Sequence, residues 1–170
     1  MQLSYAVSRG ALDGQRRRST RARTLATIAD AIPIYRAPMR SRTLDLPAGA
    51  GAEFGLEHGV VGIGPGDGPK AERMLRAFAD LAVGTFVWTR TADDRFHLGR
   101  IAGPLREDDA AATAVGLPYV RPADWLSRPF GPDEVPADVA ATFARGGRNL
   151  QRTHSASAEA RTAQLWDAAR

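Results

Sequence analysis

The amino-acid sequence predicts an α+β fold in which a small curved β-sheet is flanked by helices. Short runs of alternating apolar and polar residues, typical of strands, lie between stretches whose apolar residues have helical spacing. A chain of 170 residues with 44% apolar content can form one domain with a substantial core. We therefore expect one domain over residues 31–170, preceded by a basic and flexible segment over residues 1–30.

The first half of this domain is predicted to hold two short strands and one helix. The strands are residues 32–37, followed by a Gly/Ala-rich loop, and the buried run 60–63, followed by the glycine-rich loop GIGPGDG. That loop lacks the G-x-G-x-x-G spacing, and Pro65 removes a backbone donor, so we interpret it as a turn. The helix begins near Pro69, and its core-facing stripe is Ala71, Met74, Leu75, Phe78 and Leu81.

A β-hairpin is predicted over residues 83–103, VGTFVWTRTADDRFHLGRIAG. Phe86 and Trp88 fall on one face of its first strand, and TADDR forms the turn. Gly99, inside the second strand, indicates a bulge or a close backbone approach of the kind found in small curved barrels. The hairpin carries unusually many arginines for a core element, and these lie next to a tryptophan.

The C-terminal part is predicted to add one strand and two helices. The acidic stretch 106–116 is interpreted as a loop, and the strand LPYVRPADWLS is expected to end near Arg121 because Pro122 cannot donate to a ladder. One helix runs from residue 136 to about 144. The last helix begins at Ser155 or Ser157 and packs through Leu165 and Trp166.

The distribution of charge favours an anionic partner. The chain has 23 Lys and Arg residues, of which Lys70 is the only lysine, a net charge of +4 and a pI near 10.3. Arginines cluster in residues 16–23, 36–42 and 145–152, a pattern found in proteins that bind nucleic acid. A GC-rich genome would also favour arginine over lysine, so both explanations stay open.

Several other classes of protein are disfavoured by what the sequence lacks. There is no cysteine, the three histidines are far apart, and no Ser-His-Asp spacing or Walker loop occurs. The acidic pairs Asp93–Asp94 and 107–109 are explained more simply as turns than as a nuclease centre. We therefore expect a binding module without catalytic activity, cofactor or metal. With no leader or apolar run of spanning length, we also expect a soluble, cytoplasmic protein.

The order of the motifs resembles a known family. GVVGIG, a helix, VGTFVWTR, DDRFHLGRIAGP, LPYVRPADWLS and a helix beginning P-x-D-V occur in the order seen in the PUA-like superfamily. Within it, the chain resembles the EVE-like modules related to the modified-base readers of prokaryotic modification-dependent restriction systems. The matching segments are residues 84–87, 96–103 and 121–126, and the resemblance covers about residues 32–166. Thr85 replaces the usual aspartate, and residues 1–30 have no counterpart.

This resemblance implies a PUA-like, EVE-like β-barrel flanked by helices, with a pocket at one end for a single flipped-out base. The pocket is expected between the end of the GVVGIG strand and the strands of Trp88 and Tyr119, with Trp125 at its border. The candidate base-binding residues are Trp88, Arg90, Arg100, Tyr119, Arg121, Trp125 and Gly64. The candidate phosphate contacts are Arg16, Arg17, Arg18, Arg40 and Arg42.

Alternatives remain for the aromatic residues and for the function as a whole. Trp88 equally suits the barrel core, Trp125 the core or the pocket rim, and Tyr119 ordinary edge packing. The predicted function is to read a modified DNA base in a restriction or phage-defence system, with RNA not excluded and with a nuclease or NTPase as a possible partner protein. A protein-interaction or structural module and a nuclease subunit are the alternatives.

Overall fold

The computed structural model describes residues 32–170 except 65, 108, 109 and 148. The predicted segment 1–30, with Arg16, Arg17 and Arg18, lies outside the described residues. The strands are β1 (Ile34–Arg36), β2 (Val60–Ile63), β3 (Phe86–Arg90), β4 (Phe96–Ile101), β5 (Arg106–Glu107), β6 (Tyr119–Trp125) and β7 (Gln151–Thr153). The helices are α2 (Ala50–Glu57), α3 (Pro69–Ala79), α4 (Ala110–Ala114), α5 (Ala137–Ala144) and α6 (Ala156–Ala168).

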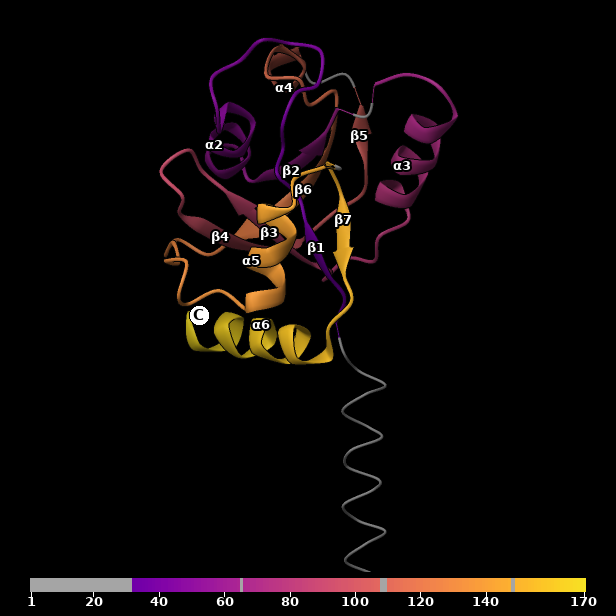
Figure 1. Ribbon diagram of the computed structural model, residues 1–170. Helices are drawn as coiled ribbons and strands as arrows, with labels where there is room; N and C mark the ends of the chain where they lie inside the picture. The colour runs from indigo at the N-terminus through magenta and orange to yellow at the C-terminus, as the bar shows by residue number, and fades with distance from the viewer. Residues whose placement is uncertain (1–31, 65, 108–109, 148) are drawn as a thin grey trace, which may run out of the picture. The chain divides into compact units, whose positions relative to one another are not determined.

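The strands form one curved sheet in the order β2-β6-β4-β3-β1-β7 (Figure 1). Only the β1–β3 pair is parallel among these ladders. Strand β6 is paired with β2 along one edge, and with β5 and then β4 along the other, so the sheet turns about this strand. The predicted α+β class, a curved sheet flanked by helices, is confirmed.

Each face of the sheet packs against its own helices. Val87 and Ile101 belong to a core with residues of α2, α3 and α4, whereas Phe86 and Trp88 belong to a second core with residues of α5 and α6. Successive residues of a strand point to opposite faces, so a strand covered on both sides has no polar face. This explains why most positions of the hairpin β3–β4 are buried.

Two predictions about the elements were wrong, and each has a local cause. The expected loop after β1 contains the helix α2. Gly51 and Gly55 lie one turn apart on this helix and allow Met39 to pack closely against it. A Cβ at Gly51, for example, would collide with the Met39 carbonyl oxygen. Strand β6 runs past Pro122 to Trp125. Proline is tolerated there because its own carbonyl still accepts from the Ala102 amide at 2.8 Å, so the strand keeps this contact without the missing N–H.

The sequence analysis also missed three short elements. The expected acidic loop holds β5 and α4, and the arginine-rich stretch 145–152 leads into β7, which pairs with β1. Elements of two to five residues carry too little periodicity to be recognised. The helices α3, α5 and α6 were correctly predicted, including the Ser155 cap of α6, whose hydroxyl accepts from the Ala158 amide.

Arg121 of β6 is buried and holds the end of α3. Its side chain, 2% exposed, donates to four backbone carbonyls: those of Phe78, Ala79, Leu81 and Gly103, at 2.7–3.2 Å. The last carbonyls of a helix have no partner within the helix and carry its negative dipole end, so a guanidinium satisfies them well. Burial lowers the pKa of this side chain. Arg121 thus has a structural role in this fold and is not available to nucleic acid, contrary to the prediction.

We predict that Arg121→Met lowers the free energy of unfolding by about 3 kcal/mol, because four carbonyls then have no charged donor inside the protein. Chemical denaturation monitored by tryptophan fluorescence measures this change. Arg73→Met, on the exposed side of α3, is the matched control and should change stability by no more than about 0.5 kcal/mol. Equal effects of the two substitutions would contradict the capping role.

Candidate functional site

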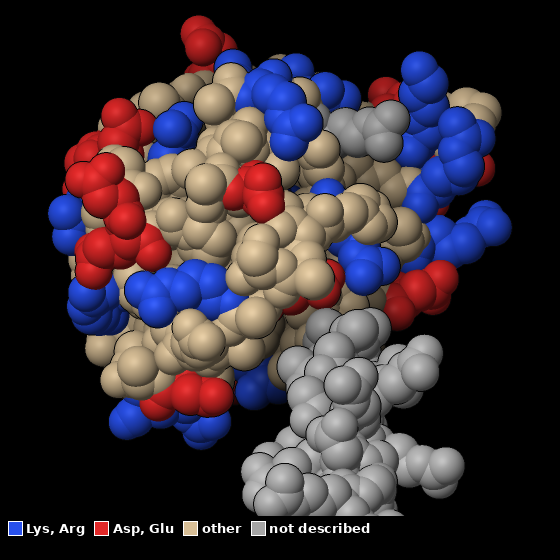
Figure 2. Space-filling model, turned by 60° about the horizontal axis from the view of Figure 1, so that its bottom comes forward, with Lys and Arg blue, Asp and Glu red and all other residues tan. Residues whose placement is uncertain are grey.

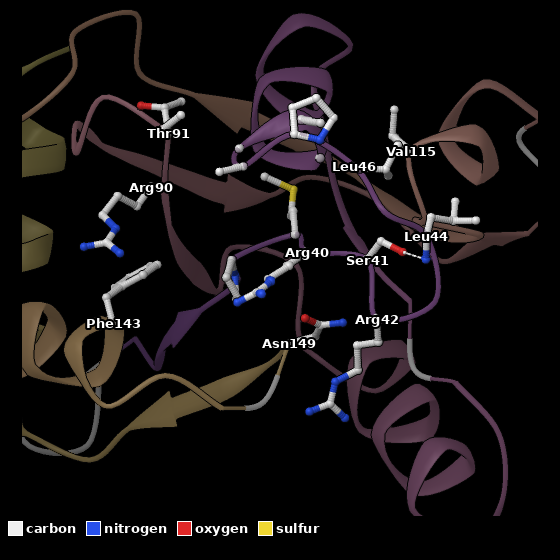
Figure 3. Close-up of a pocket in the computed structure, with 18 of the residues that line it drawn as sticks. Arg40, Ser41, Arg42, Leu44, Leu46, Arg90, Thr91, Val115, Phe143 and Asn149 are labelled. Atoms are coloured by element: carbon white, nitrogen blue, oxygen red, sulfur yellow. Dashed lines mark hydrogen bonds between the residues drawn. The ribbon is translucent and has the colours of Figure 1, made fainter.

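A cleft of about 830 Å³ lies between the segment 38–51, the β3–β4 turn and the end of α5 (Figure 3). Its wall therefore comes from three parts of the chain that are distant in sequence. The basic lining residues are Arg36, Arg40, Arg42 and Arg90, the acidic ones are Asp45 and Asp94, and the larger apolar ones are Met39, Leu44, Leu46, Val115 and Phe143.

The segment after β1 is held in a defined conformation. Met39 has a left-handed backbone (φ 47°). Its buried side chain fits against Gly55 of α2, and its carbonyl oxygen lies against Gly51. Two residues on, the hydroxyl of Ser41 accepts from the amide of Leu44 at 2.9 Å and closes a tight turn. Arg40 lies between these two fixed points, and both Arg40 and Arg42 are exposed at the mouth of the cleft.

Arg36 and Phe143 form the inner wall. The buried guanidinium of Arg36 donates to the carbonyls of Thr142 and Gly146, where α5 ends. It also lies 5.3 Å from the centre of the Phe143 ring, and the guanidinium of Arg90 lies 5.7 Å from the same centre. Arg90 in addition forms an ion pair with Asp94 at 3.3 Å. The ring is thus in cation–π contact with two arginines.

The electrostatic character of the cleft follows from this gathering of arginines. Burial lowers the pKa of Arg36, and the positive charges of Arg90 and Arg145 lower it further. The two carboxylates of the lining offset part of the positive charge, yet four arginines line the same wall. A concave site with low-dielectric walls concentrates the field of such charges, so the cleft attracts anions.

Asn149 closes the innermost part of the cleft. Only 3% of this residue is exposed, and its Nδ2 donates to the carbonyl oxygen of Gly64 at 3.0 Å. Gly64 must be glycine at this place, because a Cβ would collide with the carbonyl oxygen of Gly116. Gly64, a candidate from the sequence, therefore acts on the cleft through Asn149. The sequence analysis identified the arginines around Asn149 but not this asparagine.

The other candidates are dispersed. Arg40, Arg42 and Arg90 line the cleft, whereas Trp88 is completely buried, donates to the Thr162 hydroxyl at 3.2 Å and packs edge-on against Phe130. Residues of the second apolar core surround that ring. The structure thus places Trp88 in the core, the alternative considered for it. Tyr119 is partly buried at the edge of the first core and does not line the cleft.

Arg100 and Trp125 lie away from this cleft and on opposite faces of the sheet. Arg100 pairs across the ladder with Asp124, so the next residue, Trp125, points to the other side. The Trp125 ring lies against Gly99, and its Nε1 donates to the Val60 carbonyl at 3.2 Å. Trp125 therefore closes the end of the first core, and the predicted pocket with Trp88, Tyr119 and Trp125 as walls is not formed.

Arg100 and Trp125, although they leave opposite faces of the sheet, both border a second, shallower depression of about 600 Å³ beside α6, with Trp166 and Arg170. The Nε of Arg100 donates to the Gly84 carbonyl at 3.0 Å, and its guanidinium lies 5.0 Å from the Phe86 ring centre and 5.5 Å from that of Trp166. Basic and acidic side chains are mixed on the face seen in Figure 2. This face therefore attracts a polyanion less strongly than the arginine-rich cleft does.

Two features are absent from the described residues. Within these residues, no group of three or more His, Cys, Asp or Glu side chains is placed to bind a metal ion. None of the helices that the structure describes has the length and apolar character needed to cross a membrane.

The chain was compared with known protein families, curated proteins and solved structures. No protein-family model matches the chain, and no curated protein matches its sequence. Among solved structures, the YTH domain of the Zygosaccharomyces rouxii MRB1 protein, crystallised in complex with N6-methyladenosine RNA, is similar with a TM-score of 0.46 and 15% identity. The likeness covers 83% of this chain and 90% of that domain. We draw no conclusion about function from a likeness of this degree.

The burial of Trp88 yields a prediction that separates packing from binding. We expect Trp88→Ala to cost about 3–5 kcal/mol of stability, because it leaves a cavity in the second core. We also expect the folded variant to bind any ligand of the cleft as the parent does. Thermal unfolding and a binding titration well below the melting temperature measure the two effects. Much weaker binding by a folded variant would show that Trp88 contributes to the binding site.

Proposed function

We propose that this chain is a nucleic-acid-binding module whose cleft takes one nucleotide, the base inside and the neighbouring phosphates at the mouth. The observation that carries the proposal is the cleft itself, about 830 Å³ in volume with four arginines in its wall. That volume lies within the roughly 300–1,000 Å³ range of small-molecule sites in proteins. A base that enters such a site must leave the stack of its strand, as bases do for other proteins that read them singly.

Arg40 and Arg42 suit the phosphate contacts. Both are exposed at the mouth of the cleft, and within the described residues neither forms an ion pair. Their charges are therefore available to an external anion. Arginine also binds phosphate through two parallel hydrogen bonds, which gives these contacts direction as well as attraction.

The inner wall suits a base, although not by an aromatic cage. Among the described lining residues Phe143 is the one aromatic side chain, and the guanidinium groups of Arg36 and Arg90 both lie within cation–π distance of it. Guanidinium planes stack on bases as aromatic rings do. Stacking contributes about 1–3 kcal/mol per base, comparable with the few kcal/mol needed to extrude one. The apolar side chains of Met39 and Leu46 complete the wall.

The finer part of the proposal depends on the sequence resemblance to EVE-like modules. It is that the base is a modified one in DNA, read without catalysis, and that the protein works beside a nuclease or NTPase in a cytoplasmic restriction or defence system. A protein-interaction module with the same fold is the competing candidate. It would show no salt-dependent affinity for nucleic acid.

The test is a fluorescence-anisotropy titration with single- and double-stranded DNA and RNA, each in unmodified, cytosine-methylated and adenine-methylated form. We expect micromolar binding at low salt that weakens steeply as salt is added, because cations are released from the phosphates on binding. The modified forms show whether the base is read. Absence of binding to every oligonucleotide at low salt would overturn the proposal.

Replacing the two arginines at the mouth should reduce affinity in a particular way. For Arg40→Ala and Arg42→Ala we expect weaker binding to all sequences. The slope of log affinity against log salt should be smaller by about 0.7–0.9 for each phosphate that the variant no longer neutralises. Arg73→Ala, which removes an equal charge from the exposed face of α3, is the control. If it changes the slope as much, the effect is one of net charge and not of the cleft.

A further inference from the structure

Asn149, the only asparagine in the chain, has an amide whose orientation is fixed by its surroundings. Its Nδ2 lies 3.0 Å from the carbonyl oxygen of Gly64. A carbonyl oxygen accepts hydrogen bonds and cannot donate, so the amide must present its nitrogen to Gly64. The opposite end of the carboxamide, the oxygen Oδ1, then faces away from β2.

This oxygen is directed into the cleft and has no partner among the described residues. In Figure 3 it points to the side of the Arg40 side chain, away from the nitrogen that Gly64 binds. No described residue donates a hydrogen bond to it. Asn149 as a whole is 3% exposed. Its Oδ1 is not one of the fully buried polar atoms without a partner, so the small exposed part of the residue includes this oxygen.

A buried acceptor with a fixed direction discriminates strongly between ligands. A ligand that brings an N–H to it forms a hydrogen bond, whereas one that brings another acceptor leaves both oxygens desolvated and unpaired. The arginines of the lining can only donate, so Asn149 supplies an acceptor deep in a cleft whose basic side chains all donate.

We infer that Asn149 selects the base that enters the cleft by accepting a hydrogen bond from the 6-amino group of adenine or the 4-amino group of cytosine, the positions at which guanine and thymine carry a carbonyl oxygen. A monomethylated amine keeps one N–H and satisfies the same acceptor. The inference depends on the proposed function, since it names the class of base for the same cleft.

The backbone around Asn149 supports a positioning role for its neighbours. Gly64 lies against the backbone of Gly116, and Gly116 in turn admits Ser41, whose hydroxyl closes the turn that carries Arg42. These contacts hold the carbonyl that orients the amide. A larger residue at Gly64 would displace the acceptor without removing it.

The experiment uses oligonucleotides of one sequence that differ at a single nucleotide. One pair compares adenine with purine, which lacks the amine, and a second pair compares cytosine with 2-pyrimidinone. For the intact chain we expect removal of the amine to weaken binding about tenfold in at least one pair. Asn149→Leu, which has nearly the same shape without the acceptor, should bind both members equally. Gln151→Leu, two residues further along the chain and outside the cleft, should keep the tenfold ratio.

The outcomes separate this inference from the proposed function. Equal binding of both members of each pair by the intact chain would overturn the role of Asn149 and leave nucleic-acid binding in place. So would a tenfold ratio that persists in folded Asn149→Leu, or a preference for thymine or guanine. Absence of binding to every oligonucleotide would overturn both. If Asn149→Leu does not fold, Asn149→Ala takes its place in the experiment. If neither variant folds, the ratio measured for the intact chain alone decides whether the amine is recognised.

Discussion

The arrangement of this molecule depends on two buried arginines that satisfy the carbonyl ends of helices. Arg121 reaches from β6 to the end of α3, and Arg36 from β1 to the end of α5. Removing a guanidinium from water is unfavourable, and the lowered pKa of both side chains reflects it. The unpaired carbonyls at a helix end offset that cost, because they need donors and lie at the negative end of the helix dipole. A guanidinium can serve several of them at once.

The position of the cleft follows from the second of these contacts. By fixing the end of α5 against β1, Arg36 also fixes Phe143 and the glycines that follow the helix, and these form one wall. The same positive charge that caps the helix faces Arg90 across the Phe143 ring. Packing and attraction for anions are therefore supplied by one residue, and neither can be altered without the other.

The sequence predicted elements with strong periodicity and failed where a role depends on register. The hairpin β3–β4 and helices α3, α5 and α6 were predicted because their apolar spacing is clear, while α2 was missed because its glycines and alanines form no apolar stripe. From the sequence alone, Arg121 is indistinguishable from an arginine that contacts phosphate. Its structural role is recognised only once the end of α3 beside it is known. Likewise Arg100 and Trp125, both predicted for one pocket, point to opposite faces because Arg100 pairs with Asp124. The site residue Asn149 belongs to no pattern at all.

The cleft combines two kinds of polar group, and they contribute differently to recognition. The arginines at its mouth are exposed, so the phosphate contacts proposed for them would be screened by salt and independent of sequence. Asn149 is enclosed, and the contacts among Ser41, Gly116 and Gly64 connect it to the turn that carries Arg42. An acceptor held in this way cannot rotate to suit a mismatched ligand, so it rejects one through an unmet hydrogen bond. The proposed function therefore assigns affinity and selectivity to different residues of one cleft, so that exchange of the exposed arginines would alter the first while backbone contacts keep the second fixed.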